Sequence, residues 1–135
     1  MKHYFLIFIT AFVLNAVWEH AHSFLYLHHK SGIITEYILF RAAIFDGAII
    51  TLFAFIFLSV LNYKYRLWIM AAGLFIFAVG LELWALETSR WMYADAMPVI
   101  PFLNTGLTPT IQLSLLGYLS VLIVQRFKNF APPTR

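Results

Sequence analysis

Residues 36–61 read EYILFRAAIFDGAIITLFAFIFLSVL, an apolar run in which the charged residues are Glu36, Arg41 and Asp46. A helix needs about 20 apolar residues to cross the hydrocarbon core of a bilayer. Three other stretches reach this length, so we expect spans at 4–27, 36–61, 66–88 and 105–126. The sequence therefore predicts an all-α fold, an integral membrane four-helix bundle formed by a single domain, residues 1–130.

The composition agrees with this prediction. Of the 135 residues, 62% are apolar, 19% aromatic and 11% charged, whereas a soluble domain carries about 25% charged residues. So few charged side chains cannot cover a surface in water, and we expect a multi-pass protein of the cell membrane surrounded by lipids. The nine Lys and Arg residues form no stripe, so we expect no nucleic-acid partner. The absence of cysteine excludes disulfides and cysteine nucleophiles.

The basic residues also predict the orientation, because Lys and Arg in short loops are retained in the cytoplasm. The side that holds Lys30 and Arg90 is expected outside, together with the segment Ser89–Asn104, which has room for a re-entrant or surface structure. The first span is too long for a signal peptide, so we expect it to be retained and both termini to be cytoplasmic. Residues 131–135, which include two prolines, are expected to form a flexible tail. Six basic residues fall on the expected cytoplasmic side: Lys2, Lys64, Arg66, Arg126, Lys128 and Arg135.

All four expected spans carry polar side chains, which are costly in hydrocarbon and by default indicate a functional site. With a rise of about 1.5 Å per residue, Arg41, Asp46 and Gln112 lie roughly 8, 15 and 10 Å below the outer surface. The other polar residues of the first and third spans also fall in the outer half. We therefore expect the four helices to bring polar groups to overlapping depths. The polar residues are Asn15, Glu19, His20, His22, Arg41, Asp46, Glu82, Glu87 and Gln112.

Helical periodicity predicts which of these side chains face one another. Asn15, Glu19 and His22 share one face of the first span, which must point into the bundle. Arg41 and Asp46 are five residues apart, about 140° around the helix, so we expect Arg41 to form an ion pair with Glu19 or Glu82 instead. Three carboxyl groups against one arginine leave an excess of acid. At least one carboxyl group is therefore expected to be uncharged and able to donate a proton.

A purely structural polar network is a second interpretation. In it a carboxylate neutralises Arg41, while Gly47, Gly73 and Gly80 let the helices approach closely. The protein would then be a non-enzymatic membrane subunit or a lipid-binding scaffold, with itself or another membrane protein as partner.

A metal site is a third interpretation, because His20, His22, Asp46 and Glu82 are all of ligand type. His20 and His22 are two residues apart and point away from each other on a helix. Since no His-x-x-x-His pair lies within a span, we expect no metal and no cofactor.

Two short motifs resemble membrane enzymes of isoprenoid metabolism. Residues 82–93, ELWALETSRWMY, with Met97-Pro98 after them, resemble the lycopene cyclase domain and, less closely, the carotenoid hydratases. In these families an acidic residue near a helix end precedes a Gly-x-Trp-x-Tyr-like turn and a proline segment. Residues 15–19, NAVWE, are similar to the Trp-Glu element of membrane-bound terpene cyclases. The paired glutamates that follow the proline in lycopene cyclases are replaced here by Phe102-Leu103-Asn104.

The resemblance implies a membrane-embedded enzyme that acts on a hydrophobic isoprenoid or carotenoid-like substrate by carboxylate acid–base chemistry. Glu19 or Glu82 would be the acid, with Asp46 or His22 as its partner, and aromatic faces would stabilise a carbocation. The chain as a whole also resembles a group of uncharacterised small four-span prokaryotic membrane proteins, which implies no function. The expected substrate-binding residues are Trp18, Trp84, Trp91, Tyr93, Arg41, Glu87, Asn15 and Gln112.

Overall fold

Four long helices form the structure, a computed structural model that describes residues 2–30, 32–60 and 65–130. All four are long and apolar enough to cross a membrane, which confirms the expected all-α four-helix bundle. The expected tail, residues 131–135, lies outside the described residues. The helices are α1 (Lys2–His22), α2 (Glu36–Val60), α3 (Arg66–Glu87) and α4 (Leu107–Phe130).

Short strands cover one end of the bundle, and the sequence analysis did not predict them. After α1 a 3₁₀ turn (Ser23–Leu25) leads into β1 (Tyr26–His29), which pairs in antiparallel fashion with β2 (Trp91–Tyr93). The first helix is therefore shorter than the expected span 4–27. Strands of this length carry too few residues to show an alternating pattern in a sequence.

The segment Ser89–Asn104 holds most of the remaining extended structure. It contains β2 and β3 (Val99–Ile100), and β3 pairs in antiparallel fashion with β4 (Thr105–Gly106) just before α4. The segment thus forms short strands, and whether it is re-entrant or lies at the membrane surface stays a prediction.

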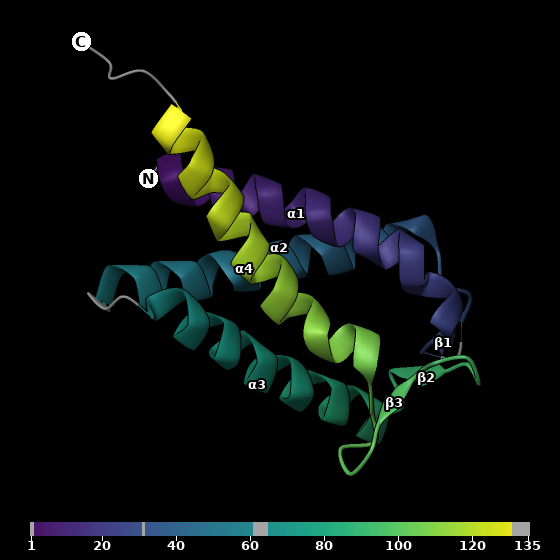
Figure 1. Ribbon diagram of the computed structural model, residues 1–135. Coiled ribbons are helices and arrows are strands. Elements are labelled where there is room, and N and C mark those ends of the chain that lie inside the picture. Colours follow the sequence, from purple (N-terminus) through teal and green to yellow (C-terminus); the bar gives the residue numbers. More distant parts are fainter. Residues whose placement is uncertain (1, 31, 61–64, 131–135) are drawn as a thin grey trace.

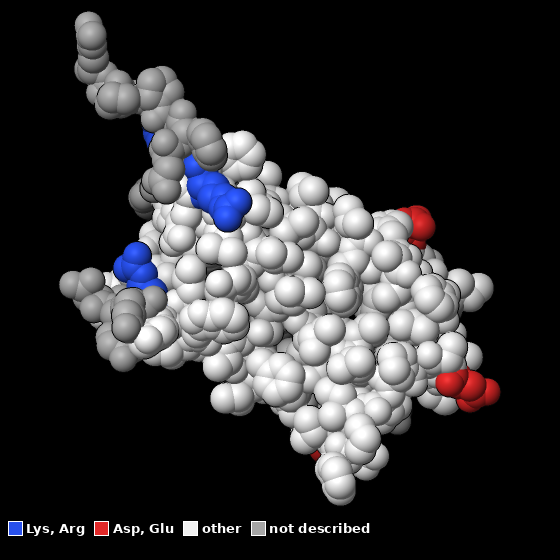
Figure 2. Space-filling model, in the orientation of Figure 1, with Lys and Arg blue, Asp and Glu red and all other residues white. Residues whose placement is uncertain are grey.

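Figure 1 shows the start of α1 and the end of α4 at one end of the bundle and the strands at the other. On the face drawn in Figure 2, basic side chains gather near the first end, acidic side chains lie near the second, and the band between them is uncharged. An uncharged band of this kind fits a hydrocarbon environment. Which end faces the cytoplasm stays a prediction from the charge distribution.

Small residues let the helices pack closely in the core. A Cβ on Gly47 of α2 would lie 3.3 Å from the backbone nitrogen of Phe12 on α1, and one on Gly73 would lie 3.2 Å from the Phe53 ring. Nothing lies within 4 Å of a Cβ on Gly80, so its expected role in close helix approach is wrong. The buried apolar cluster consists of Ile7, Ala11, Ile50, Ala54, Met70, Leu74, Ala78, Leu113, Leu116, Val121 and Val124.

The contrast between two glycines gives a test of this packing. Gly47→Leu forces a side chain against the α1 backbone, so we expect the free energy of unfolding to fall by about 1–3 kcal/mol. Gly80→Leu places the same side chain in open space and should change the free energy of unfolding by less than about 0.5 kcal/mol. Thermal unfolding of the purified variants in detergent measures both, and equal effects would contradict the close α1–α2 contact.

Candidate functional site

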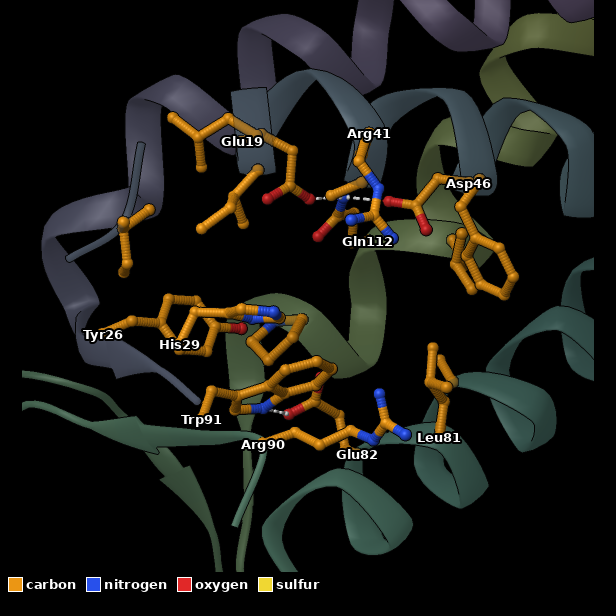
Figure 3. A pocket seen from close by; sticks show the side chains of 18 of the residues that line it. Glu19, Tyr26, His29, Arg41, Asp46, Leu81, Glu82, Arg90, Trp91 and Gln112 are labelled. Carbon is orange, nitrogen blue, oxygen red and sulfur yellow. Dashed lines mark hydrogen bonds between the residues drawn. The ribbon is translucent and has the colours of Figure 1, made fainter. Parts of the chain in front are cut away.

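A cavity of about 380 Å³ lies near the strand end of the bundle. Its lining includes Glu19 from α1, Asp46 from α2, Glu82 from α3 and Gln112 from α4. Most of the other lining side chains are apolar or aromatic. Figure 3 shows Glu19, Gln112 and Asp46 on one side of this space and Glu82 on the other. The polar groups of four helices therefore meet at one place, as their depths in the sequence predicted.

The side-chain amide of Gln112 connects three of the helices. Its Nε2 lies 2.9 Å from Asn15 Oδ1, 2.7 Å from Glu19 Oε1 and 2.9 Å from Asp46 Oδ2. Asn15, Asp46 and Gln112 are buried, and Asn15 Nδ2 also donates to the Ala11 carbonyl oxygen at 2.8 Å. The amide thus holds both carboxyl groups against one wall of the cavity.

The number of hydrogens at this amide has a chemical consequence. An NH₂ group has two hydrogens, but three oxygen acceptors surround the Gln112 nitrogen. Both carboxyl groups lie beside this one nitrogen, so one of the three oxygens is left without a hydrogen from the amide. A proton shared between the two carboxyl groups would supply the missing donor.

Glu82 on the opposite wall is bound through one oxygen. The Tyr93 hydroxyl donates to Glu82 Oε2, and Trp91 Nε1 donates to the same atom at 3.3 Å. The Tyr93 oxygen in turn accepts from the Gly106 N–H at 2.8 Å. Burial and the nearby Glu82 charge raise the pKa of Tyr93 above its usual value, so it stays a donor. Within the described part of the chain, Glu82 Oε1 has no hydrogen-bond partner.

The expected ion pair of Arg41 is wrong. Within residues 2–30, 32–60 and 65–127, the one ion pair joins His20 Nε2 to Glu36 Oε2 at 2.6 Å. The Arg41 guanidinium instead lies 5.7 Å from the centre of the Tyr37 ring. Helical side chains tilt toward the N-terminal end of their helix, and in α2 this is the end where Tyr37 lies. Arg41 still lines the cavity.

The other expected site residues fall into two groups. Trp84 and Trp91 line the cavity. Tyr93 and Asn15 are hydrogen-bonded to the lining residues Glu82 and Gln112, respectively. His22, Trp18 and Glu87 are absent from its lining.

His22 is placed by its own helix. Its Nδ1 lies 2.7 Å from the Trp18 carbonyl oxygen, and its ring packs against Tyr26. Glu87 is exposed, because its position five residues after Glu82 turns it by about 140° away from the cavity.

Four polar lining residues were not predicted as site residues: Tyr26, His28, His29 and Arg90. Tyr26, His28 and His29 come from β1, and Arg90 comes from the turn before β2. The Lys30 N–H donates to the Arg90 carbonyl oxygen at 2.6 Å, and this hydrogen bond joins the two segments. Burial, followed by the charges of Lys30, Arg41 and Arg90, lowers the pKa of His29. Their proximity depends on strand pairing between distant segments, for which the sequence carries no local signal.

Comparison with protein-family models, with curated proteins and with solved structures gave no match. The resemblance to carotenoid enzymes therefore stays a prediction. In the part of the chain that the structure describes, no three His, Cys, Asp or Glu side chains are grouped in a way that could hold a metal ion.

Two glutamines of α4 give a test of the polar network. Gln112→Leu leaves buried acceptors on α1 and α2 without a donor, so we expect the free energy of unfolding to fall by about 1–3 kcal/mol. Gln125→Leu, on the same helix but outside the network, should change the free energy of unfolding by less than about 0.5 kcal/mol. Thermal unfolding in detergent measures the difference. A Gln112→Leu variant as stable as the wild type would show that the amide does not join the helices.

Proposed function

We propose that this protein is a membrane-embedded enzyme that moves protons on and off a hydrophobic isoprenoid or carotenoid-like substrate. The observation that carries the proposal is Glu82 Oε1. It is a carboxyl oxygen without a partner among the described residues, on a side chain that is 4% exposed and lines a largely apolar cavity. A general acid needs this arrangement, in which one oxygen is positioned by hydrogen bonds and the other can reach the substrate.

The two walls of the cavity can supply the two halves of a redox-neutral reaction. Protonated Glu82 adds its proton to one carbon of a double bond, and the neighbouring carbon becomes a cation. The carboxylate of the Glu19–Asp46 pair then removes a proton from an adjacent carbon, so that a double bond forms again. The net change is an isomerisation, or a cyclisation if another double bond attacks the cation first. Neither outcome requires an oxidant or a reductant.

The remaining lining suits such a substrate. A cavity of about 380 Å³ falls within the usual size of small-molecule sites. Tyr26 and Trp91 present aromatic rings to it, and an aromatic face attracts a nearby cation. The Trp84 ring already carries the Arg90 guanidinium, whose carbon lies 4.1 Å from the ring centre and whose positive charge would repel a carbocation. Tyr26 and Trp91 are therefore the rings that would stabilise the carbocation.

The non-enzymatic alternative, a membrane subunit or lipid-binding scaffold, is favoured by the Gln112 network. Hydrogen bonds from one amide to α1 and α2 hold the bundle together whether or not a substrate binds. A scaffold does not account for the unpartnered oxygen of Glu82. Substitution of Glu82 therefore distinguishes the two functions.

Deuterium transfer tests the enzyme directly. The purified protein is incubated in D₂O with three acyclic polyenes, namely lycopene, squalene and geranylgeraniol, and carbon-bound deuterium is measured by mass spectrometry. We expect the wild type to label at least one of them and Glu82→Gln to lose roughly 100-fold or more of the rate. Loss of label is expected because glutamine cannot donate the proton.

Glu36→Gln is the matched control, since Glu36 is exposed and outside the cavity lining. It should label the substrate at the wild-type rate, and gel filtration should show all variants folded. Absence of label from every polyene with the wild type, or equal label with Glu82→Gln, contradicts the proposed function.

A further inference from the structure

Two arginines line the cavity without an acidic partner. Arg41 comes from α2, and Arg90 comes from the turn between α3 and β2. Within residues 2–30, 32–60 and 65–127, neither guanidinium forms an ion pair or a side-chain hydrogen bond. Each lies over an aromatic ring instead, Tyr37 and Trp84 respectively. Their N–H groups are therefore available to a ligand.

Both arginines lie toward the strand end of the bundle. Arg41 is in the second turn of α2, and Arg90 is in the turn three residues after the end of α3. Figure 3 shows their guanidinium groups on opposite sides of the cavity, Arg41 on the side of Gln112 and Asp46 and Arg90 on the side of Glu82. Each side of the cavity thus carries one guanidinium group as well as at least one carboxyl group.

An oxyanion is the ligand that matches these two arginines. A guanidinium presents a planar fork of N–H donors that binds phosphate or carboxylate through two parallel hydrogen bonds. Arg41 is exposed and Arg90 is half-buried, so a ligand can reach both guanidinium groups. The two arginines together carry two positive charges, which a phosphate monoester balances better than a carboxylate, because the phosphate carries about −1.5 to −2 at neutral pH.

We propose that the cavity binds the phosphate monoester head group of a long-chain amphiphile between Arg41 and Arg90. The proposal rests on the proposed function in one respect, since the hydrocarbon chain would occupy the space beside Glu82. The carboxylate of the Glu19–Asp46 pair repels an anion. The head group therefore stays between the arginines and the chain occupies the apolar part of the cavity, which presents the hydrocarbon to the carboxyl groups.

Binding of dodecyl phosphate to the full chain in dodecyl maltoside tests the proposal by isothermal titration calorimetry. We expect Arg41→Gln and Arg90→Gln each to weaken binding by about tenfold or more. Arg41→Lys and Arg90→Lys retain the charge but lose the planar fork, and each should weaken binding severalfold. The lysine variants also provide the test if a glutamine variant does not fold. Lys30→Gln removes a charge from an exposed residue at the same end, outside the cavity lining, and should leave the affinity within about twofold.

Other ligands identify the source of the anion. Inorganic phosphate, dodecanoate, dodecanol and dioleoyl phosphatidylcholine should each bind at least about tenfold more weakly than dodecyl phosphate. Equal affinity for inorganic phosphate would indicate a free-anion site, and equal affinity for phosphatidylcholine would indicate bulk lipid. Equal affinity for dodecanoate or dodecanol, or unchanged affinity in the arginine variants, would also overturn the proposal.

The two proposals can fail separately. Arginine-dependent binding of dodecyl phosphate without Glu82-dependent deuterium transfer retains the head-group site and removes the proposed enzyme. Deuterium transfer to a neutral polyene with no effect of either arginine on dodecyl phosphate binding retains the enzyme and removes the head-group site.

Discussion

The hydrogen bonds of Gln112 are the constraint on which the rest of the site depends. One amide nitrogen with two hydrogens faces three oxygens from α1 and α2. In a bilayer, apolar contacts between helices resemble contacts with lipid and give little preference for one arrangement, so polar contacts become decisive. The network therefore sets the relative position of three helices and at the same time places the Glu19 and Asp46 carboxyl groups on one amide nitrogen.

The paired strands β1 and β2 complete the site, because they connect α3 to the three helices that Gln112 joins. Tyr93 and Trp91 on β2 hold one oxygen of Glu82, and the pairing of β2 with β1 brings His29 and Arg90 to the same cavity. A wall with two carboxyl groups and an opposing carboxyl oxygen thus result from two sets of contacts. The Glu82 oxygen without a partner among the described residues is what favours the proposed enzyme over a purely structural network.

The sequence predicted the parts of the site that depend on helix geometry. Glu19, Asp46, Glu82 and Gln112 could be placed because rise and rotation along a helix determine depth and face. The prediction was wrong where a residue's place depends on side-chain direction, because Arg41 turns toward Tyr37 instead of a carboxylate. It was also incomplete where strand pairing brings a residue to the site, as the pairing of β1 with β2 does for Arg90. The carotenoid-like substrate depends on short motifs and stays a prediction.

A proton shared between Glu19 and Asp46 is the most direct test of this account, and infrared spectroscopy of the membrane-reconstituted protein detects it. Besides the band of protonated Glu82, the account predicts a second carbonyl band of a protonated carboxyl group at neutral pH, which shifts in D₂O, is retained in Glu82→Gln and is lost in both Glu19→Gln and Asp46→Asn. Asp95→Asn, at an exposed position outside the cavity lining, should leave the band unchanged. Absence of the band in the wild type, or its persistence in both site variants, would contradict a shared proton.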